Sequence, residues 1–210
     1  MKNLLYFISI IFFFPITNNI SAQDINENSW MCSFNFNPSI LLSNNNWSLK
    51  HPVYQATGKI QYEEINGIFE QSIFVSGGLE VKKGHFAFQG NIGFIPQKLT
   101  KNMPVKDKEL NLLFSELSIL FYPMKYNGSP FNPFISIGGA LLKASGDIDN
   151  TGLMISYTGG VKIPLYSKIG FNLGLKGMLL RYTQLQLSEN ISKDISIYPF
   201  ALFIGAFYQF

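Results

Sequence analysis

Two histidines are the residues in this chain best suited to proton transfer, and neither has an obvious catalytic partner. A histidine acts as a general base when it lies beside a serine hydroxyl or a carboxylate. His85 follows Gly84 at a tight turn, while His51 lies in a long polar stretch that also contains serines and Glu63. A loop histidine before a proline is the simpler interpretation of His51. We therefore expect no catalytic residue and no enzymatic activity.

The stretch SGDIDNTG is the nearest approach to a metal-binding motif. It places Asp147, Asp149 and Asn150 before Gly152, a spacing that faintly matches a calcium loop. The bidentate carboxylate that closes such a loop is missing. Residues of the Asx and Gly types are also what a hairpin loop requires. The sequence therefore predicts neither a bound metal nor another cofactor.

Four charged residues stand out because they interrupt segments that are otherwise apolar or small. They are Glu80, Glu116, Lys162 and Lys176. A charge that is removed from water must be paired, because an unpaired buried charge is strongly destabilising. Glu116 and Lys176 lie at similar distances from the neighbouring turns, and so do Glu80 and Lys162. We predict that these four residues form an interior ion-pair network.

The segments that would hold these charges alternate between apolar and small or polar residues, as β-strands do. In SIFVSGGLEVKKGHFAFQGNIGF the apolar residues from Ile73 to Val81 occupy odd positions, and after the turn they occupy even positions. This change of parity predicts a hairpin. With a two-residue loop at Lys83 and Gly84, Lys82 would pair with His85.

The same alternation recurs in eight segments, which are connected in turn by short and longer stretches. The segments are SWMCSFNF, SIFVSGGLEV, HFAFQGNIGF, LLFSELSILFY, FNPFISIGGALLK, LMISYTGGVKI, IGFNLGLKGMLLRY and ISIYPFALFIGAFYQF. The short connections are 82–84, 123–130 and 165–168, and the longer ones are about 43–71, 96–109, 144–152 and 183–194. Short turns at one end and long loops at the other are typical of a transmembrane β-barrel. Residues 43–71 are numerous enough for an added hairpin around 54–62, but its outward face would be polar, so we expect eight barrel strands.

The face opposite the apolar residues is rich in Gly, Ser, Ala and Asn and carries few charges. In a soluble sandwich or a lipocalin-like barrel this face would meet water and would be more strongly charged. Small side chains instead fit the interior of a narrow barrel, and rings near strand ends are typical of membrane interfaces. The sequence therefore predicts an all-β fold, an eight-stranded antiparallel up-and-down transmembrane β-barrel.

The first residues have the layout of a secretory signal peptide. Lys2 precedes an apolar run from Leu4 to Phe14, which is too short to span a membrane, and a polar stretch ends at Ala22. We expect residues 1–22 to be the signal peptide and residues 23–210 to be the barrel domain. Charged residues make up 14% of the chain, against about 25% in soluble domains. A net charge of +3 is too small to predict a nucleic-acid partner.

An exported chain of eight alternating strands that ends in an aromatic residue resembles the small OmpA-like and OmpX-like outer-membrane β-barrels. Tyr208 and Phe210 share one face of the last segment, and SELSILFYPM followed by NPFISIGGALL is similar to the fourth and fifth strands of that family. The resemblance implies a place in the cell outer membrane, among its lipids and lipopolysaccharide. It also implies that Tyr208 and Phe210 form the terminal signal read by the barrel assembly machinery.

Three classes of function suit such a barrel. We favour a non-enzymatic barrel with a plugged lumen that presents extracellular loops to a protein partner, as an accessory subunit of a secretion or transport complex or as an adhesin-like protein. The alternatives are a small porin-like channel and a lipid A-modifying enzyme. The long loops supply a binding surface, whereas the lumen charges and the histidines supply little mechanism.

Overall fold

The computed structural model describes eleven strands. The described residues are 30–42, 45–54, 58, 60–69, 72–100, 108–124, 131–146, 150–166, 168–188 and 191–210. The strands are β1 (Met31–Leu41), β2 (Asn45–Tyr54), β3 (Ile60–Phe69), β4 (Ile73–Lys83), β5 (Phe86–Thr100), β6 (Lys108–Phe121), β7 (Asn132–Gly146), β8 (Asn150–Pro164), β9 (Ile169–Ser188), β10 (Ile191–Ile197) and β11 (Phe200–Gln209). The predicted signal peptide, residues 1–22, lies outside the described residues. In the described part of the chain, no helix is long and apolar enough to cross a membrane.

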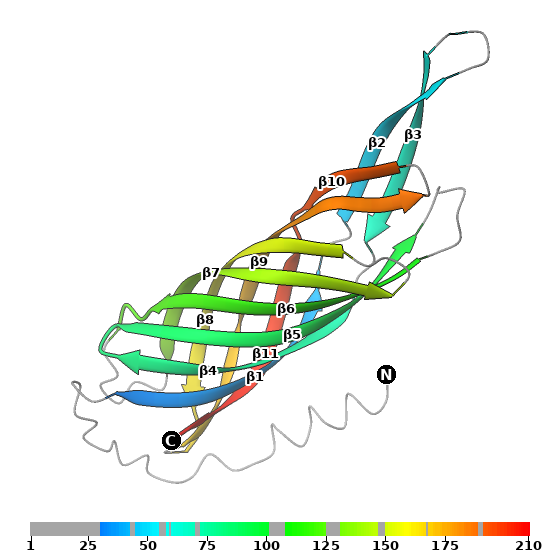
Figure 1. Cartoon of the computed structure of the whole chain (residues 1–210). Coiled ribbons are helices and arrows are strands. Elements are labelled where there is room, and N and C mark those ends of the chain that lie inside the picture. Colours follow the sequence, from blue (N-terminus) through cyan, green and yellow to red (C-terminus); the bar gives the residue numbers. More distant parts are fainter. Residues whose placement is uncertain are drawn as a thin grey trace, which may run out of the picture.

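Eight of these strands close into an antiparallel barrel (Figure 1). The ring runs β1, β4, β5, β6, β7, β8, β9, β11, and β11 pairs again with β1. Each strand of the ring therefore lies beside the ring strands that precede and follow it in sequence. The predicted eight-stranded antiparallel up-and-down barrel is confirmed. Closure satisfies the backbone of every ring strand on both sides, which an open sheet cannot do.

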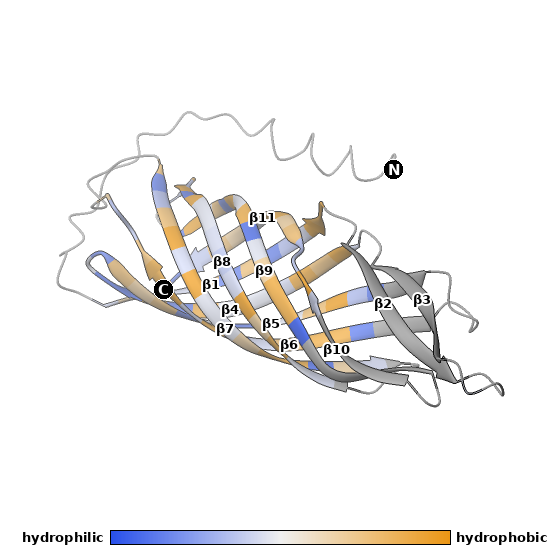
Figure 2. Ribbon diagram, turned by 90° about the horizontal axis from the view of Figure 1, so that it is seen from above, coloured by the Kyte–Doolittle hydropathy of each residue, from blue (hydrophilic) through white to orange (hydrophobic). Residues whose placement is uncertain are grey.

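The two faces of the ring are the reverse of those in a soluble barrel. On β6 the outward-facing Leu117 is 76% exposed, whereas its neighbours Glu116 and Ser118 are buried inside. Hydrophobic and hydrophilic residues alternate in this way along the barrel strands (Figure 2). A continuous apolar outer surface is unfavourable in water and favourable in the hydrocarbon of a bilayer. The packed core is consequently the lumen.

Two hairpins extend the sheet beyond the ring at one end, the opposite end from the C-terminus (Figure 1). β2 and β3 pair along their whole length, and β3 joins the ring where Ile68 and Phe69 pair with the end of β5. The long β9 continues past the ring and pairs with β10. The first long connection is thus an added hairpin, and it supplies no strand to the ring.

Three of the predicted loops are shorter than expected because the strands run on. Residues 96–109 were predicted as a loop, but β5 continues to Thr100 and β6 begins at Lys108. Residues 183–194 were predicted as a loop, but β9 continues to Ser188 and β10 begins at Ile191. Residues 144–152 were also predicted as a loop, but Ala144 pairs with Asn150. The sequence RYTQLQLS keeps a weak alternation, in which Leu185 and Leu187 are its only aliphatic residues. A strand beyond the membrane does not need an apolar face, so hydropathy alone missed it.

The turn between β4 and β5 differs by one residue from the prediction. Its two residues are Gly84 and His85, and Lys83 pairs with Phe86. Gly84 has a φ of 57°, the left-handed conformation that a tight hairpin turn requires and that glycine adopts easily. The predicted pairing of Lys82 with His85 is therefore wrong. The pairing shifts by an even number of residues, so the apolar residues of both strands still lie on the same face of the hairpin.

Candidate functional site

The first ion pair in the lumen joins β4 to β8. The Nζ atom of Lys162 lies 2.6 Å from Oε2 of Glu80. The hydroxyl of Tyr122 donates a hydrogen bond of 2.6 Å to Oε1 of the same carboxylate. Lys82 also lies inside the barrel, with its Nζ atom 3.8 Å from the centre of the Tyr122 ring. Glu80 therefore has a partner on each oxygen, although it is only 2% exposed.

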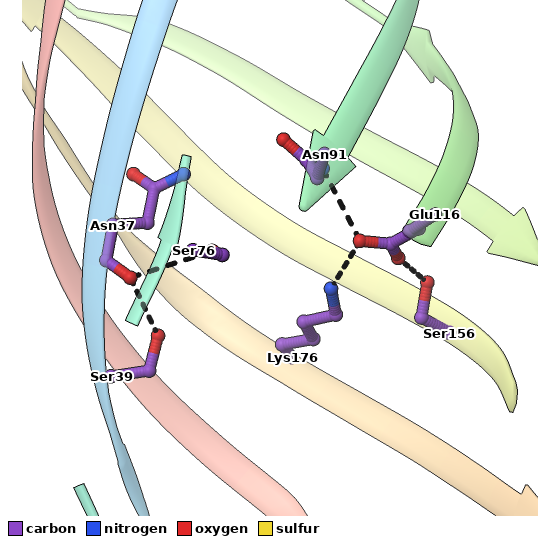
Figure 3. A network of polar contacts seen from close by, with 7 residues as sticks. All are labelled: Asn37, Ser39, Ser76, Asn91, Glu116, Ser156 and Lys176. Atoms are coloured by element: carbon purple, nitrogen blue, oxygen red, sulfur yellow. Dashed lines mark hydrogen bonds and ion pairs between the residues drawn. The ribbon is translucent and has the colours of Figure 1, made fainter. Parts of the chain in front are cut away.

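The second ion pair joins β6 to β9 (Figure 3). The Nζ atom of Lys176 lies 2.6 Å from Oε2 of Glu116. Asn91 donates a hydrogen bond of 3.2 Å to that oxygen, and the hydroxyl of Ser156 donates to Oε1. Four ring strands thus meet at one carboxylate. Hydrogen bonds of this kind offset part of the desolvation that a buried charge suffers.

A third polar contact ties β9 to β1 across the lumen. The side-chain amide of Asn172 donates hydrogen bonds of 3.1 Å to Asn35 and 3.2 Å to Asn37. The backbone carbonyl of Asn37 in turn accepts hydrogen bonds from Ser39 and Ser76 (Figure 3). Short polar side chains on facing strands therefore bridge the interior directly, which holds the barrel narrow.

Two apolar clusters adjoin these polar contacts. The larger cluster lies toward the β2–β3 hairpin and includes Phe74 and Phe114, whose rings pack edge to face with centroids 6.5 Å apart. The smaller cluster lies toward the short turns and includes Leu120, Tyr122 and Phe134. Two small cavities of about 40 and 30 Å³ lie in the described polar lumen, and the second touches Lys82 and Asn132 at the turn end. Spaces of this size hold a few water molecules.

Solved structures of bacterial outer-membrane proteins share this architecture. No protein-family model and no curated protein sequence matches the chain. The outer membrane protein OprG from Pseudomonas aeruginosa is 12% identical with a TM-score of 0.56, and the match covers 87% of this chain and 97% of OprG. The outer membrane protein AlkL, solved in lipid bilayers, is 14% identical with a TM-score of 0.52, covering 92% and 96%. Neisserial surface protein A is 15% identical with a TM-score of 0.50, covering 85% and 97%.

The chain has the fold of an outer-membrane β-barrel. At these identities the likeness establishes the fold of the barrel and not its activity. The chain shares the closed eight-stranded architecture of the OmpA-like and OmpX-like barrels, which its sequence resembles.

In this outer-membrane barrel fold, the four charges singled out from the sequence all point into the lumen. The structure brings them together as two pairs, Glu80 with Lys162 and Glu116 with Lys176. One small cavity touches all four residues, so the two pairs share one layer of the lumen. Parity along the strands located these residues, because alternate positions of a barrel strand must face inward.

Sequence reasoning missed several neutral members of this layer. Tyr122, Ser156 and Asn172 have the same parity as the charges on or next to their strands, and Asn91 has the inward parity of β5. Parity was therefore the signal that could have found them. It does not show which side chains reach one another across the barrel, since that depends on strand tilt and register. Lys82 was missed because the hairpin turn was placed one residue too early.

The other candidate residues lie apart from this layer. His85 sits at the β4–β5 turn, where its Nδ1 atom lies 2.7 Å from the backbone carbonyl oxygen of Tyr122. His51 is on β2, and its side chain is outside the described part of the structure, as are Asp147 and Asp149. Among described residues, no group of three or more His, Cys, Asp or Glu side chains could hold a metal ion.

The terminal aromatic residues lie on the outer surface of the barrel at the seam that closes it. Tyr208 and Phe210 are 41% and 69% exposed, and their rings pack edge to face 5.3 Å apart. The backbone amide of Phe210 donates a hydrogen bond of 2.9 Å to the carbonyl of Cys32 on β1. The two aromatic side chains therefore add apolar surface to the outside of the barrel and do not fill the lumen.

Proposed function

We propose that this protein is a closed, non-enzymatic barrel of the cell outer membrane that binds a protein partner through the hairpins at its loop end. It would serve as an accessory subunit of a secretion or transport complex or as an adhesin-like surface protein. The observation that carries this proposal is the filled lumen, which leaves the projecting hairpins as the part of the molecule able to act on something outside the membrane.

The lumen favours a scaffold over a pore. Side chains from facing strands touch across it in two ion pairs, and apolar clusters fill the lumen toward the loop end and toward the turns. A porin-like channel requires a continuous path for water through the barrel. Here the cavities along the described polar lumen measure about 40 and 30 Å³.

The loop end favours a protein as the partner. β2 and β3 are ten residues long and extend beyond the ring. β2 is an edge strand of the described sheet, with β3 as its one paired neighbour, and β10 is another, paired with β9. The backbone of an edge strand can pair with a strand from another chain. An arm of this kind provides contact area without any change to the barrel that anchors it.

The contact of His85 with the turn argues against a catalytic role for this histidine, whereas His51 pairs with Glu63 across the β2–β3 hairpin at the loop end. A lipid A-modifying enzyme would require a histidine near a nucleophile or carboxylate at the outer rim. His85 lies at the opposite end, and its ring contacts a backbone carbonyl. It thereby links the β4–β5 turn to the end of β6.

The proposal is tested by photo-crosslinking in native outer membranes. One photoreactive residue replaces Trp47 on β2, and a matched one replaces Tyr166 in the β8–β9 turn at the other end. We expect a discrete crosslinked protein from position 47 and none from position 166. Replacing residues 43–71 by a short turn should abolish the complex while the barrel stays folded, because β1 and β4 pair directly as far as Ile40 and Ile73. A complex of unchanged yield without the hairpin would refute the proposal.

A further inference from the structure

The outer surface of the barrel is hollowed on the side formed by β5 to β9. The hollow has a volume of about 580 Å³ and crosses the outward faces of these five strands. Its apolar wall includes Ile92, Leu113, Leu141 and Leu153. Lys143 and Arg181 also line it, and none of the described residues around it is acidic. A surface that combines an apolar trough with two cations is complementary to an anionic amphiphile.

Strand register explains how this hollow arises. Ile92 pairs with Ser115, Ser115 pairs with Leu141, and Leu141 pairs with Leu153. These residues form one row across the outside of the barrel. Ser115 is the small member of the row, between two large apolar neighbours. Its short side chain leaves the space that they border.

The two cations lie where the apolar outer surface ends. On β7 the outward residues change from Leu141 to Lys143, and on β9 from Leu179 to Arg181. In a membrane barrel such a change marks the level of the lipid headgroups. A lysine or arginine there extends to the interface and binds phosphate.

The positions of the two cations allow both to reach one headgroup. Lys143 on β7 is paired with Thr151 on β8, and Arg181 on β9 is paired with Leu153 on β8. The backbones of β7 and β9 are two strand spacings apart and the two positions are offset by two residues along β8, so their Cα atoms are roughly 12 Å apart. Two long side chains span such a distance around a phosphate. An arginine in addition offers several donors in a planar fork that suits phosphate oxygens.

We propose that this hollow is a binding site for a phosphorylated lipid of the leaflet on the loop side of the barrel. Lys143 and Arg181 hold its phosphate, and an acyl chain lies along Leu113, Leu141 and Leu153. In an outer membrane, the lipid of this chemistry in that leaflet is lipid A. The site depends on the barrel being embedded in a membrane and not on the loop-end partner, so either proposal can fail without the other.

The test measures lipid retained by the purified, folded barrel. The protein in mild detergent is mixed with bis-phosphorylated lipid A, and native mass spectrometry records the bound fraction. Lys143→Gln with Arg181→Gln should weaken binding about tenfold or more, since each removes a charged hydrogen bond to phosphate. Lys83→Gln with Lys168→Gln, which removes two exposed cations at the turn end, is the matched control and should bind like the wild type.

Three further measurements test whether the hollow recognises the phosphate and the acyl chain of one lipid together. Ser115→Trp fills the hollow without changing its charge and should also weaken binding. Lipid A with its phosphates removed should bind as weakly as the double variant does. Inorganic phosphate at the same concentration should not compete. Equal binding by the two charge variants, equal binding of the dephosphorylated lipid, or full competition by inorganic phosphate would each overturn the proposal.

Discussion

The carboxylate of Glu116 is the most heavily bonded of the described side chains in the lumen. It accepts from Lys176, Asn91 and Ser156 while being only 2% exposed. Desolvation of two charges opposes their attraction, so a buried pair of this kind contributes less to net stability than its short distance suggests. Its main effect is to disfavour any arrangement that separates the partners. The pair thus fixes the positions of β6 and β9 relative to each other across the lumen.

Removing one partner of the pair should therefore destabilise the barrel more than removing both charges. We expect Lys176→Met to lower the free energy of unfolding by about 3 to 5 kcal/mol, because Glu116 is left charged and buried. The double variant Glu116→Gln, Lys176→Met should recover most of this loss, since a neutral amide can still bond to Asn91 and Ser156. The measurement is urea unfolding in lipid vesicles, followed by tryptophan fluorescence.

The control for this cycle is Lys168→Met in the exposed β8–β9 turn, whose effect should stay within about 0.5 kcal/mol. Additive losses in the double variant would contradict the idea that the two charges act as one unit.

The terminal residue should matter for assembly more than for stability. Phe210 is 69% exposed on the outer surface, so Phe210→Ala removes little packing from the folded barrel. We expect the folded protein to keep its unfolding midpoint, while the amount inserted by a reconstituted barrel assembly machinery falls several-fold. Phe86→Ala is a matched control, since that ring is 58% exposed on the same outer face. Equal losses of insertion in both variants would mean that Phe210 acts only as generic apolar surface.

At the scale of the strands, inward-facing rings and glycines are matched. Four phenylalanines cover four lumen glycines on neighbouring strands, so that each ring occupies the space that a side chain would fill. The pairs are Phe114 with Gly93, Phe134 with Gly160, Phe203 with Gly174 and Phe207 with Gly170. Alternation of large and small residues on facing positions lets eight strands close around a filled interior.

Two adjacent glycines on β8 test this matching. A Cβ atom at Gly160 would lie 2.7 Å from the carbonyl oxygen of Leu173 and 2.9 Å from the Phe134 ring, so Gly160→Ala should destabilise by about 1 to 3 kcal/mol. A Cβ atom at Gly159 would meet no described atom within 4 Å, so Gly159→Ala should be close to neutral. Unfolding midpoints in vesicles give both values. Similar losses for both would show that backbone flexibility, and not lumen packing, sets the cost.

The sequence predicted the strands well and their ends less well, for a physical reason. Inside the membrane each strand must place an apolar residue outward at alternate positions, and this alternation can be recognised in the amino-acid sequence. Beyond the membrane the requirement ends, so the continuation of β9 to Ser188 left only the weak alternation of Leu185 and Leu187 with glutamines. The β4–β5 turn was misplaced because Lys83–Gly84 and Gly84–His85 both give an even loop, and the parity of the flanking residues cannot separate them.

The same limit applies to the lumen. Parity predicted that Glu80, Glu116, Lys162 and Lys176 face inward. It could not predict that Tyr122 bonds to Glu80, because that contact joins strands far apart in the chain. The external hollow at Lys143 was also hidden from sequence reasoning. It depends on the register of five strands around Ser115.

At the scale of the whole molecule, apolar residues lie on the outside and charged residues inside, the reverse of a soluble protein. Apolar side chains such as Leu117 cover the outside, and the charged residues Glu80 and Glu116 are buried within. Two apolar clusters and two ion pairs fill successive parts of the described lumen, and we propose that they close it. An open path through the barrel requires all of these groups of side chains to move aside. Removing one group should therefore leave the lumen blocked by the others.

This arrangement predicts how conductance responds to mutation. The wild type should be silent in planar bilayers. Phe74→Ala with Phe114→Ala, which thins the cluster at the loop end, should be silent as well, because the ion-pair layer still closes the barrel. Heat-modified migration in gels verifies that each protein is folded, and a porin added afterwards verifies that the bilayer reports channels. Reproducible current steps from the wild type would show that the described side chains rearrange to open a path, and the protein would then be a small pore.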